Sequence, residues 1–119
     1  FLDTFPCNAH TTASDALRSS LPIITLKGNS FASRVASSLL VSVGLEELIT
    51  KSEKEYEELA IKIAVEKNFY KEIRNKLKKN IIDAPLFNSK LFTKKIEEAY
   101  QIVYENYKDN KKSEFIEIK

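Results

Sequence analysis

The sequence contains no tryptophan and no methionine, and only one cysteine, one histidine and two glycines among its 119 residues. A lone Cys7 cannot form an internal disulfide, which excludes a disulfide-stapled scaffold and fits a reducing compartment. His10 has no second histidine with which to build a metal site. No apolar run approaches the ~20 residues of a transmembrane helix, and the N-terminus lacks a basic segment followed by an apolar one. We therefore expect a soluble, cytoplasmic protein with no membrane partner.

Charge does not identify a partner either. Nineteen Lys and Arg stand against seventeen Asp and Glu, so the net charge is only +2 and gives no strong field toward nucleic acid. The Lys-rich residues 71–79 include an acid and an Asn but no aromatic residue, which favours a solvated helix face over a single-strand binder. We expect no nucleic-acid partner.

Two compositional halves predict an α/β protein that continues into helices. Residues 1–50 hold seven charged side chains and both glycines, whereas residues 51–119 hold the other twenty-nine charges. In the first half, short apolar runs indicate buried strands over residues 1–4 and 22–26, and the stretches 11–20 and 30–43 indicate helices. Residues 45–50 are expected to add a short strand. Strands that alternate with helices predict a parallel sheet.

The second half is predicted to be helical. Ser52 and Glu55 have the spacing of a capping box at a helix start. A break is expected near Asn68, and Ala84 before Pro85 ends the helical pattern. A last helix is expected to start near Asn88 or Ser89. Three apolar stripes recur at helical spacing, namely Tyr56, Leu59, Ala60, Ile63 and Ala64, then Phe69, Ile73, Leu77 and Ile81, then Phe92, Ile96, Ala99, Tyr100, Val103 and Tyr107.

The turn at residues 7–15 is the most informative stretch for function. If residues 1–4 form a strand and a helix begins at Thr11, this turn lies at the carboxyl end of a parallel strand, where ligands bind in open α/β sheets. The first amides of the helix and the hydroxyls of Thr11 and Thr12 would favour a phosphate. Asp15 follows one helical turn later and could accept hydrogen bonds from a sugar diol. A nucleotide fits both ends of this turn.

A purely structural explanation of the same residues remains open. Thr11 or Thr12 could be an ordinary N-cap, and Asp15 could be a favourable acid in a first helical turn. His10 could be a hydrogen-bonded turn residue, and Cys7 a small buried one.

A second anion-binding candidate follows the next predicted strand, at residues 27–30. This turn precedes a helix that contains Arg34, but it matches neither a dinucleotide fingerprint nor a P-loop. We interpret Arg34 as structural.

Beyond these local patterns, the sequence resembles the C-terminal part of the O-linked N-acetylglucosamine transferase family, which includes the SPINDLY-type enzymes. The resemblance covers nearly the whole chain. It is carried by Leu2-Asp3-Thr4-Phe5-Pro6, Asn8, His10-Thr11-Thr12, Asp15 and Leu17, by Leu21-Pro22, Thr25, Gly28, Phe31-Ala32-Ser33-Arg34-Val35-Ala36 and Ser38-Leu39-Leu40, and further along by Gly44-Leu45, Glu47-Leu48-Ile49, Glu55-Tyr56, Ala84-Pro85-Leu86-Phe87-Asn88, Phe92-Thr93 and Ala99-Tyr100.

This resemblance implies a GT-B architecture, with two Rossmann-like domains and transfer of a sugar from a nucleotide donor to protein hydroxyls, with inversion and without a metal or other cofactor. It implies that His10, Thr11 and Thr12 cradle the donor diphosphate, that Asp15 binds the ribose and that Cys7 lies beside the nucleotide. The family usually has Trp-x-Gly where this chain has Arg18, Ser19 and Ser20.

The resemblance also implies that much of the enzyme lies outside these residues. The chain begins on mostly apolar residues without an initiator Met, so we expect residues 1–119 to be a fragment of one domain, with a β-α-β-α nucleotide-binding part at 1–50 and a helical part at 51–119. We expect no catalytic residue in this chain, a protein acceptor held by the missing regions, no transfer by the fragment alone, and self-association through its open sheet edge.

Two alternatives stay open at the sequence level. The chain could be a non-catalytic helical interaction module, in which the turn at residues 10–12 is only a helix start. Alternatively, the enzyme class holds but the donor is a GDP-sugar, or the acceptor is asparagine, because the residues that would read the base lie outside the chain.

Overall fold

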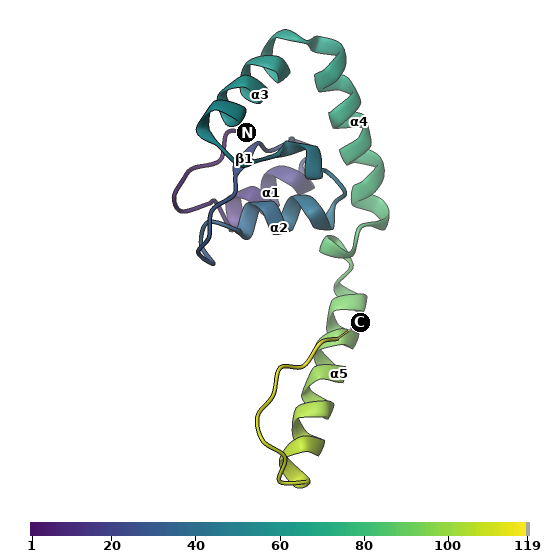
Figure 1. The fold of residues 1–119 in the computed structure, drawn as a ribbon. Coiled ribbons are helices and arrows are strands. Elements are labelled where there is room, and N and C mark those ends of the chain that lie inside the picture. Colours follow the sequence, from purple (N-terminus) through teal and green to yellow (C-terminus); the bar gives the residue numbers. More distant parts are fainter. Residues whose placement is uncertain (119) are drawn as a thin grey trace. The chain divides into compact units, whose positions relative to one another are not determined.

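A computed structural model describes residues 1–118 and divides the chain between Phe87 and Asn88 into two units (Figure 1). Unit 1, residues 1–87, contains all the strands of the described residues and four of their helices. Its elements are α1 (Thr11–Arg18), β1 (Thr25–Leu26), α2 (Val35–Ser42), a 3-10 turn η1 (Glu46–Leu48), β2 (Ile49–Thr50), α3 (Glu53–Val65), α4 (Lys67–Asp83) and a second 3-10 turn η2 (Pro85–Phe87). Unit 2 begins at Asn88 and contains α5 (Ser89–Lys108).

The sheet is parallel, as predicted, but very short. β1 pairs with β2 so that Thr25 lies opposite Ile49 and Leu26 opposite Thr50. The predicted strand at residues 1–4 is reduced to one parallel bridge between Leu2 and Ile24, where the Asp3 amide donates to the Ile24 carbonyl at 3.0 Å. The described chain is therefore mostly helical, with a small parallel sheet.

The predicted strand at residues 22–26 is shorter as well, because only Ile24, Thr25 and Leu26 pair with another strand or bridge. Two local features explain the shortening of the other two predicted strands. The carboxylate of Asp3 turns inward and accepts from the amides of Thr4 and Ala9, so the chain leaves the sheet at Thr4. In the predicted strand at residues 45–50, Glu46–Leu48 instead form η1, and only Ile49–Thr50 pair with β1.

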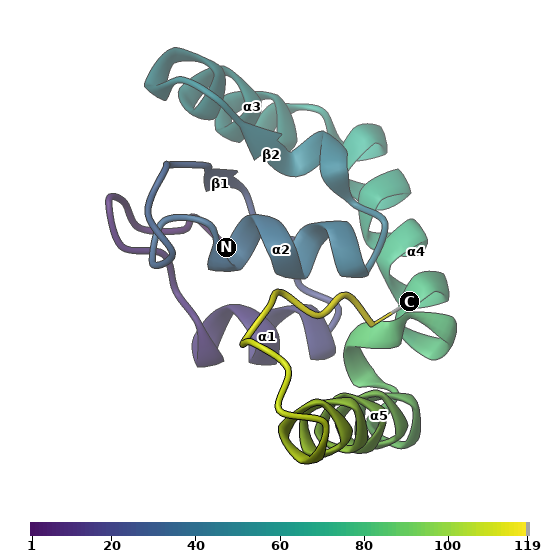
Figure 2. The same cartoon turned by 60° about the horizontal axis from the view of Figure 1, so that its bottom comes forward.

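Helices enclose the sheet within unit 1. α2 packs against β1, while α3 contacts both strands, and α1 lies beside α2 (Figure 2). α4 packs against α3 and α1. The core is made by apolar side chains of these elements, including Ala13 and Leu17 of α1, Leu40 of α2, Leu48 of η1, and Ile73 and Leu77 of α4. This packing fixes α1, and with it the predicted nucleotide turn, against the rest of unit 1.

Most helix boundaries agree with the sequence signals, but α2 begins at Val35, five residues later than predicted, with Arg34 as its N-cap. The residues before it form a turn in which Ser30 and Ser33 bond to each other. The Ser52 hydroxyl accepts from the Glu55 amide at 3.2 Å, which confirms the predicted cap at the start of α3. The Glu55 carboxylate reaches back to the amide of Lys51, one residue before the cap. The predicted break near Asn68 occurs at Glu66, and α4 ends at Asp83 before Ala84 and Pro85, as predicted.

Unit 2 is an amphipathic helix and the residues after it. Asn88 caps α5 by accepting from the Leu91 amide at 3.0 Å, which confirms the predicted helix start. No residue of α5 is buried, so its predicted apolar stripe is largely exposed, and Phe115 is exposed after it. None of the helices in residues 1–118 is both long and apolar enough to span a membrane.

Candidate functional site

The predicted nucleotide turn forms in unit 1, where the chain leaves its bridge with Ile24 and enters α1. Asp3 is 3% exposed and organises this turn through its carboxylate. One carboxylate oxygen accepts from the amides of Thr4 at 2.9 Å and Ala9 at 2.7 Å, and the other accepts from the Thr25 hydroxyl at 2.6 Å. The buried carboxylate thus ties the start of the turn, its end and β1 together.

Further hydrogen bonds fix the interior of the turn. The Thr4 hydroxyl donates to the Cys7 carbonyl at 2.7 Å. Asn8 is buried, its amide donates to the Ala32 carbonyl at 2.9 Å, and its side chain donates to the Thr4 carbonyl at 3.1 Å. These bonds hold residues 4–9 in one conformation and deliver His10 to the start of α1.

The N-terminus of α1 carries no side-chain cap. His10 occupies the N-cap position, and its side chain makes no capping hydrogen bond. The first hydrogen bond of the helix runs from the Ser14 amide to the His10 carbonyl at 3.1 Å. The amides of residues 11–13 therefore have no acceptor within the helix. The first turn contains no acidic residue. The positive end of the helix dipole therefore meets no carboxylate within that turn.

The structure contradicts the explanation of Thr11 and Thr12 as ordinary N-caps and of Asp15 as an acid of the first turn. Neither Thr11 nor Thr12 is the N-cap, and Asp15 lies beyond the first turn. Thr11, Thr12 and Asp15 are all exposed, whereas Ala13 and Leu17 face the core. Because residues three and four apart are neighbours on a helix surface, Asp15 shares one solvent face with both threonines.

His10 and Cys7 lie at the exposed entrance to this helix. The imidazole of His10 makes an edge-to-face contact with the ring of Phe31, with centroids 6.2 Å apart. Cys7 is an exposed free thiol that donates weakly to the Asn8 carbonyl at 3.8 Å. The structure thus places all five predicted residues on the same turn and helix start, and exposes the side chains of His10, Cys7, Thr11, Thr12 and Asp15.

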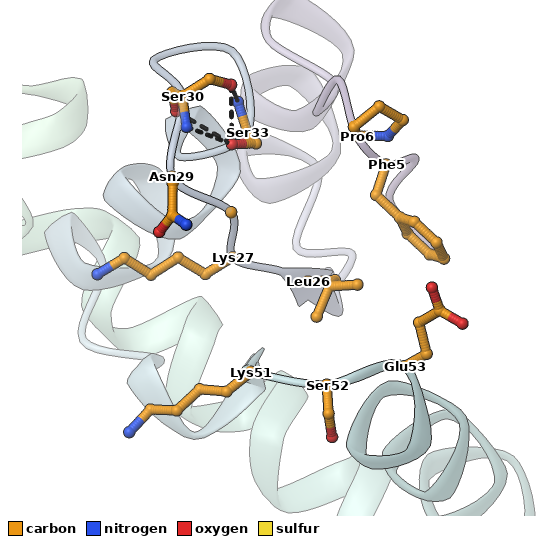
Figure 3. Close-up of a pocket in the computed structure, with 11 residues that line it drawn as sticks. Phe5, Pro6, Leu26, Lys27, Asn29, Ser30, Ser33, Lys51, Ser52 and Glu53 are labelled. Carbon is orange, nitrogen blue, oxygen red and sulfur yellow. Dashed lines mark hydrogen bonds between the residues drawn. The ribbon is translucent and has the colours of Figure 1, made fainter.

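The second predicted turn, at residues 27–30, forms one wall of a cavity of about 540 Å³ (Figure 3). The cavity lies where β1 and β2 end, and the start of α3 and the residues Phe5 and Pro6 complete its lining. It contains none of the five residues predicted for the donor. The sequence analysis identified Lys27 on this wall but missed Lys51 and Glu53. The predicted parallel pairing of the two strands was the available signal, because residues that follow parallel strands lie at the same edge of a sheet.

The turn at residues 27–30 is closed tightly by Ser33. The Gly28 amide donates to the Ser33 carbonyl at 2.9 Å, and the Ser30 amide donates to the Ser33 hydroxyl at 3.0 Å. A side chain on Gly28 would collide with the Ser33 side chain, so the close approach requires glycine.

Tyr56 connects α3 to the first turn. Its hydroxyl donates to the Asp3 carbonyl at 2.8 Å, and its ring contacts Phe5 edge to face with centroids 5.6 Å apart. Burial, together with the nearby Asp3 carboxylate, raises the pKa of Tyr56 above its ordinary value of 10.0. Within residues 1–118, no group of three or more His, Cys, Asp or Glu side chains is placed to hold a metal ion.

Comparisons with known proteins agree on one family. The sequence profile of "Glycosyl transferase family 41" matches residues 1–96. The chain is 36% identical over 108 residues to the barley (Hordeum vulgare) protein named "probable UDP-N-acetylglucosamine–peptide N-acetylglucosaminyltransferase SPINDLY", and 32% identical over 106 residues to the Caenorhabditis elegans UDP-N-acetylglucosamine–peptide N-acetylglucosaminyltransferase. These alignments include 91% and 89% of this chain, but only 11% and 9% of the two relatives.

A solved structure gives the same relationship in three dimensions. A mutant of the O-GlcNAc transferase of Thermobaculum terrenum superposes with a TM-score of 0.77 at 32% sequence identity. The superposition covers 83% of this chain and 19% of that chain. The chain therefore corresponds to a small part of each of these relatives.

Proposed function

Because the chain belongs to glycosyl transferase family 41, we propose that it is the donor-binding part of an inverting protein O-glycosyltransferase that uses a nucleotide sugar, with UDP-N-acetylglucosamine as the first candidate. In this proposal unit 1 is a portion of a Rossmann-like domain of a GT-B enzyme. The names of the relatives support the donor and the peptide acceptor, and the structural likeness to the bacterial transferase supports the architecture.

The observation that carries the proposal is the uncapped, exposed start of α1 with Asp15 one turn further along. The donor diphosphate accepts hydrogen bonds from the first amides of α1 and from the Thr11 and Thr12 hydroxyls. The ribose hydroxyls donate to the Asp15 carboxylate, while His10 and Cys7 line the entrance. Phosphate and ribose are thus recognised by one helix.

The same geometry supports the chemical step. The acceptor hydroxyl oxygen bonds to the anomeric carbon of the sugar while the bond from that carbon to the diphosphate breaks, which inverts the configuration. Negative charge develops on the departing diphosphate, and the positive end of the α1 dipole stabilises it. We propose that this replaces a metal ion, and that the base that takes the hydroxyl proton belongs to another part of the enzyme.

A titration of the 119-residue chain tests the donor site. We expect UDP and UDP-N-acetylglucosamine to shift the backbone amide resonances of residues 10–15 in two-dimensional NMR spectra, and to bind more tightly than GDP and its sugar conjugates. Asp15→Asn should weaken UDP binding about tenfold, because it removes a charged hydrogen-bond acceptor. Thr12→Val should weaken it about threefold, as expected for a neutral hydrogen bond.

Matched variants separate a site effect from a general one. Asp83→Asn removes one exposed carboxylate at the end of α4, and Thr93→Val removes one exposed hydroxyl on α5. Neither change should alter UDP affinity. Equal losses in Asp15→Asn and Asp83→Asn, or nucleotide-induced shifts that avoid residues 10–15, would contradict the proposed donor site.

Two transfer assays test whether the catalytic base lies outside this chain and whether the enzyme works without a metal ion. The chain alone, incubated with labelled UDP-N-acetylglucosamine and an acceptor peptide, should transfer no label above the enzyme-free rate, because it supplies no base. Addition of EDTA to an active full-length enzyme should leave its rate unchanged. Transfer by the isolated chain, or loss of the full-length activity with EDTA, would refute the corresponding part of the proposal.

A further inference from the structure

The cavity at the carboxyl ends of β1 and β2 is separate from the five residues proposed for the donor. Its walls come from the residues that follow both parallel strands, from the first residues of α3 and from Phe5 and Pro6. A volume of about 540 Å³ is within the range of small-molecule sites, and the ends of parallel strands are where such ligands bind in α/β sheets.

Opposite charges occupy different sides of this cavity. Lys27 follows β1 and Lys51 follows β2, and Figure 3 shows both side chains extending to the same side. Glu53 lies on the other side, which is also the side of Phe5 (Figure 3). Within residues 1–118, neither lysine belongs to the ion pairs of the structure.

Several backbone amides of this wall already bond within the fold, and we assign recognition to the two lysine side chains. The Lys27 amide donates to the Thr50 carbonyl at 3.0 Å, and the Lys51 amide donates to the Glu55 carboxylate at 2.7 Å. Ser30 and Ser33 lock the adjoining turn through four hydrogen bonds (Figure 3). The two ammonium groups are therefore presented from a preformed wall.

Apart from Glu53, the opposite half of the cavity is apolar. Leu26 and Phe5 line it, and the edge-to-face contact with Tyr56 holds the Phe5 ring in place. An inorganic anion would use the lysine side alone, whereas an ester with an apolar group would use both sides. The distribution of charge and apolar surface thus selects an amphipathic anion.

We propose that this cavity binds a phosphate monoester of a small, largely apolar organic group. The phosphate pairs with Lys27 and Lys51, the organic group lies along Leu26 toward Phe5, and Glu53 accepts from a donor on the far side of that group. Two ammonium groups match the double charge of a phosphate monoester. The proposal does not depend on the donor site at α1, because the two sites share no residue.

Phenyl phosphate and inorganic phosphate are the probes for this site. In an NMR titration of the 119-residue chain, phenyl phosphate should shift the amides of residues 27–30 and 51–53 saturably. Inorganic phosphate should shift the same amides, but its affinity should be lower than that of phenyl phosphate by about threefold or more, because it leaves the apolar half of the cavity empty. Lys27→Gln and Lys51→Gln should each weaken phenyl phosphate binding about threefold, as expected for exposed charge pairs.

The control double variant Lys67→Gln/Lys71→Gln removes two exposed charges from α4 and should leave the affinity unchanged. Equal losses in this control and in Lys27→Gln/Lys51→Gln would overturn the site, because the effect would then be one of net charge. Absence of saturable shifts at residues 27–30 and 51–53 would overturn it as well. Equal affinity for both probes would overturn the apolar half. Failure of UDP to shift residues 10–15 would refute only the donor proposal.

Discussion

At the scale of single residues, the buried carboxylate of Asp3 is the main organiser of the chain before α1. It satisfies two backbone amides and one hydroxyl, all within 2.9 Å. A buried donor that loses its acceptor costs more than an ordinary hydrogen bond gains. The conformation that presents His10 and the start of α1 therefore depends on a residue that touches no proposed ligand.

We expect Asp3→Ala to lower the free energy of unfolding by about 3 kcal/mol, because it leaves the Thr4 and Ala9 amides and the Thr25 hydroxyl without their acceptor. Asp3→Asn keeps one oxygen for the two amides and should cost about 1 kcal/mol. Urea unfolding followed by far-ultraviolet circular dichroism measures both. Equal costs for the two variants would mean that the carboxylate oxygens do not carry these bonds.

Tyr56 gives a pH-dependent contribution to stability. Its raised pKa means that the folded state holds the phenol proton more tightly than the unfolded state does. The stabilisation is therefore complete below pH 10 and is lost as the pH rises above it. Tyr56→Phe keeps the ring contact with Phe5, removes the bond to the Asp3 carbonyl and should cost about 1 kcal/mol near pH 8.

The difference between the original chain and Tyr56→Phe should become smaller as the pH rises from 8 to 11, measured by urea unfolding at each pH. Lysine titration affects both proteins alike and cancels in this difference. A difference that stays constant over that range would show that the folded and unfolded tyrosine have the same pKa.

The sequence analysis identified candidate functional residues whose roles depend on their neighbours along the chain. Thr11, Thr12 and Asp15 were predicted to share a helix start, and the structure places them on one exposed face. Lys51 and Glu53 were missed because their relation to Lys27 exists only through the pairing of β1 with β2. Asp3 was assigned to a strand, and its role depends on Thr25, which is twenty-two residues away. Their binding or structural roles required the tertiary contacts.

At the scale of elements, the end of α1 contains a residue in the left-handed conformation. Ser20 has φ of 59°, its amide donates to the Leu17 carbonyl, and the Leu21 amide donates to the Ala16 carbonyl, both at 2.9 Å. This is the bonding pattern of a Schellman motif, which favours glycine at that position. The pattern explains why the family resemblance expects glycine where this chain has Ser20.

Ser20→Gly should raise the free energy of unfolding by about 0.5 kcal/mol, because relief of the left-handed strain exceeds the extra entropy of an unfolded glycine. Ser19→Gly is the matched control, since Ser19 has φ of −82° and carries no such strain. That change should instead lower stability by about 0.5 kcal/mol. Thermal and urea unfolding of both variants give the signs, and a stabilising Ser19→Gly would contradict this explanation.

Element type was predictable because helices and turns carry local signals. The caps at Ser52 and Asn88, and the stop before Pro85, depend on residues within one turn of the boundary. Strand length was not predictable, because a strand ends where its partner ends. In this chain the inward-turned Asp3 carboxylate shortens the first strand, and η1 shortens the strand at residues 45–50. No local pattern in residues 1–4 or 45–50 predicts either effect.

At the scale of the whole molecule, the buried apolar residues of the described chain all belong to unit 1. The core extends from Ala13 to Ala84, with Leu86 and Phe87 of η2 packed against it, and α5 contributes no buried residue. The proposed donor turn and the phosphate cavity both belong to this unit. Residues 1–87 therefore contain the contacts on which both proposals rest.

We expect a chain of residues 1–87 to unfold cooperatively, with a thermal midpoint within about 4 °C of that of the 119-residue chain, equivalent to about 1 kcal/mol or less. The control chain ends at Asp83 and also lacks Ala84, Leu86 and Phe87. It should lose about 3 kcal/mol, because these side chains are removed from the core. Circular dichroism melts of the three chains make the comparison. A broad transition for residues 1–87, or equal midpoints for both truncations, would show that η2 does not complete the core.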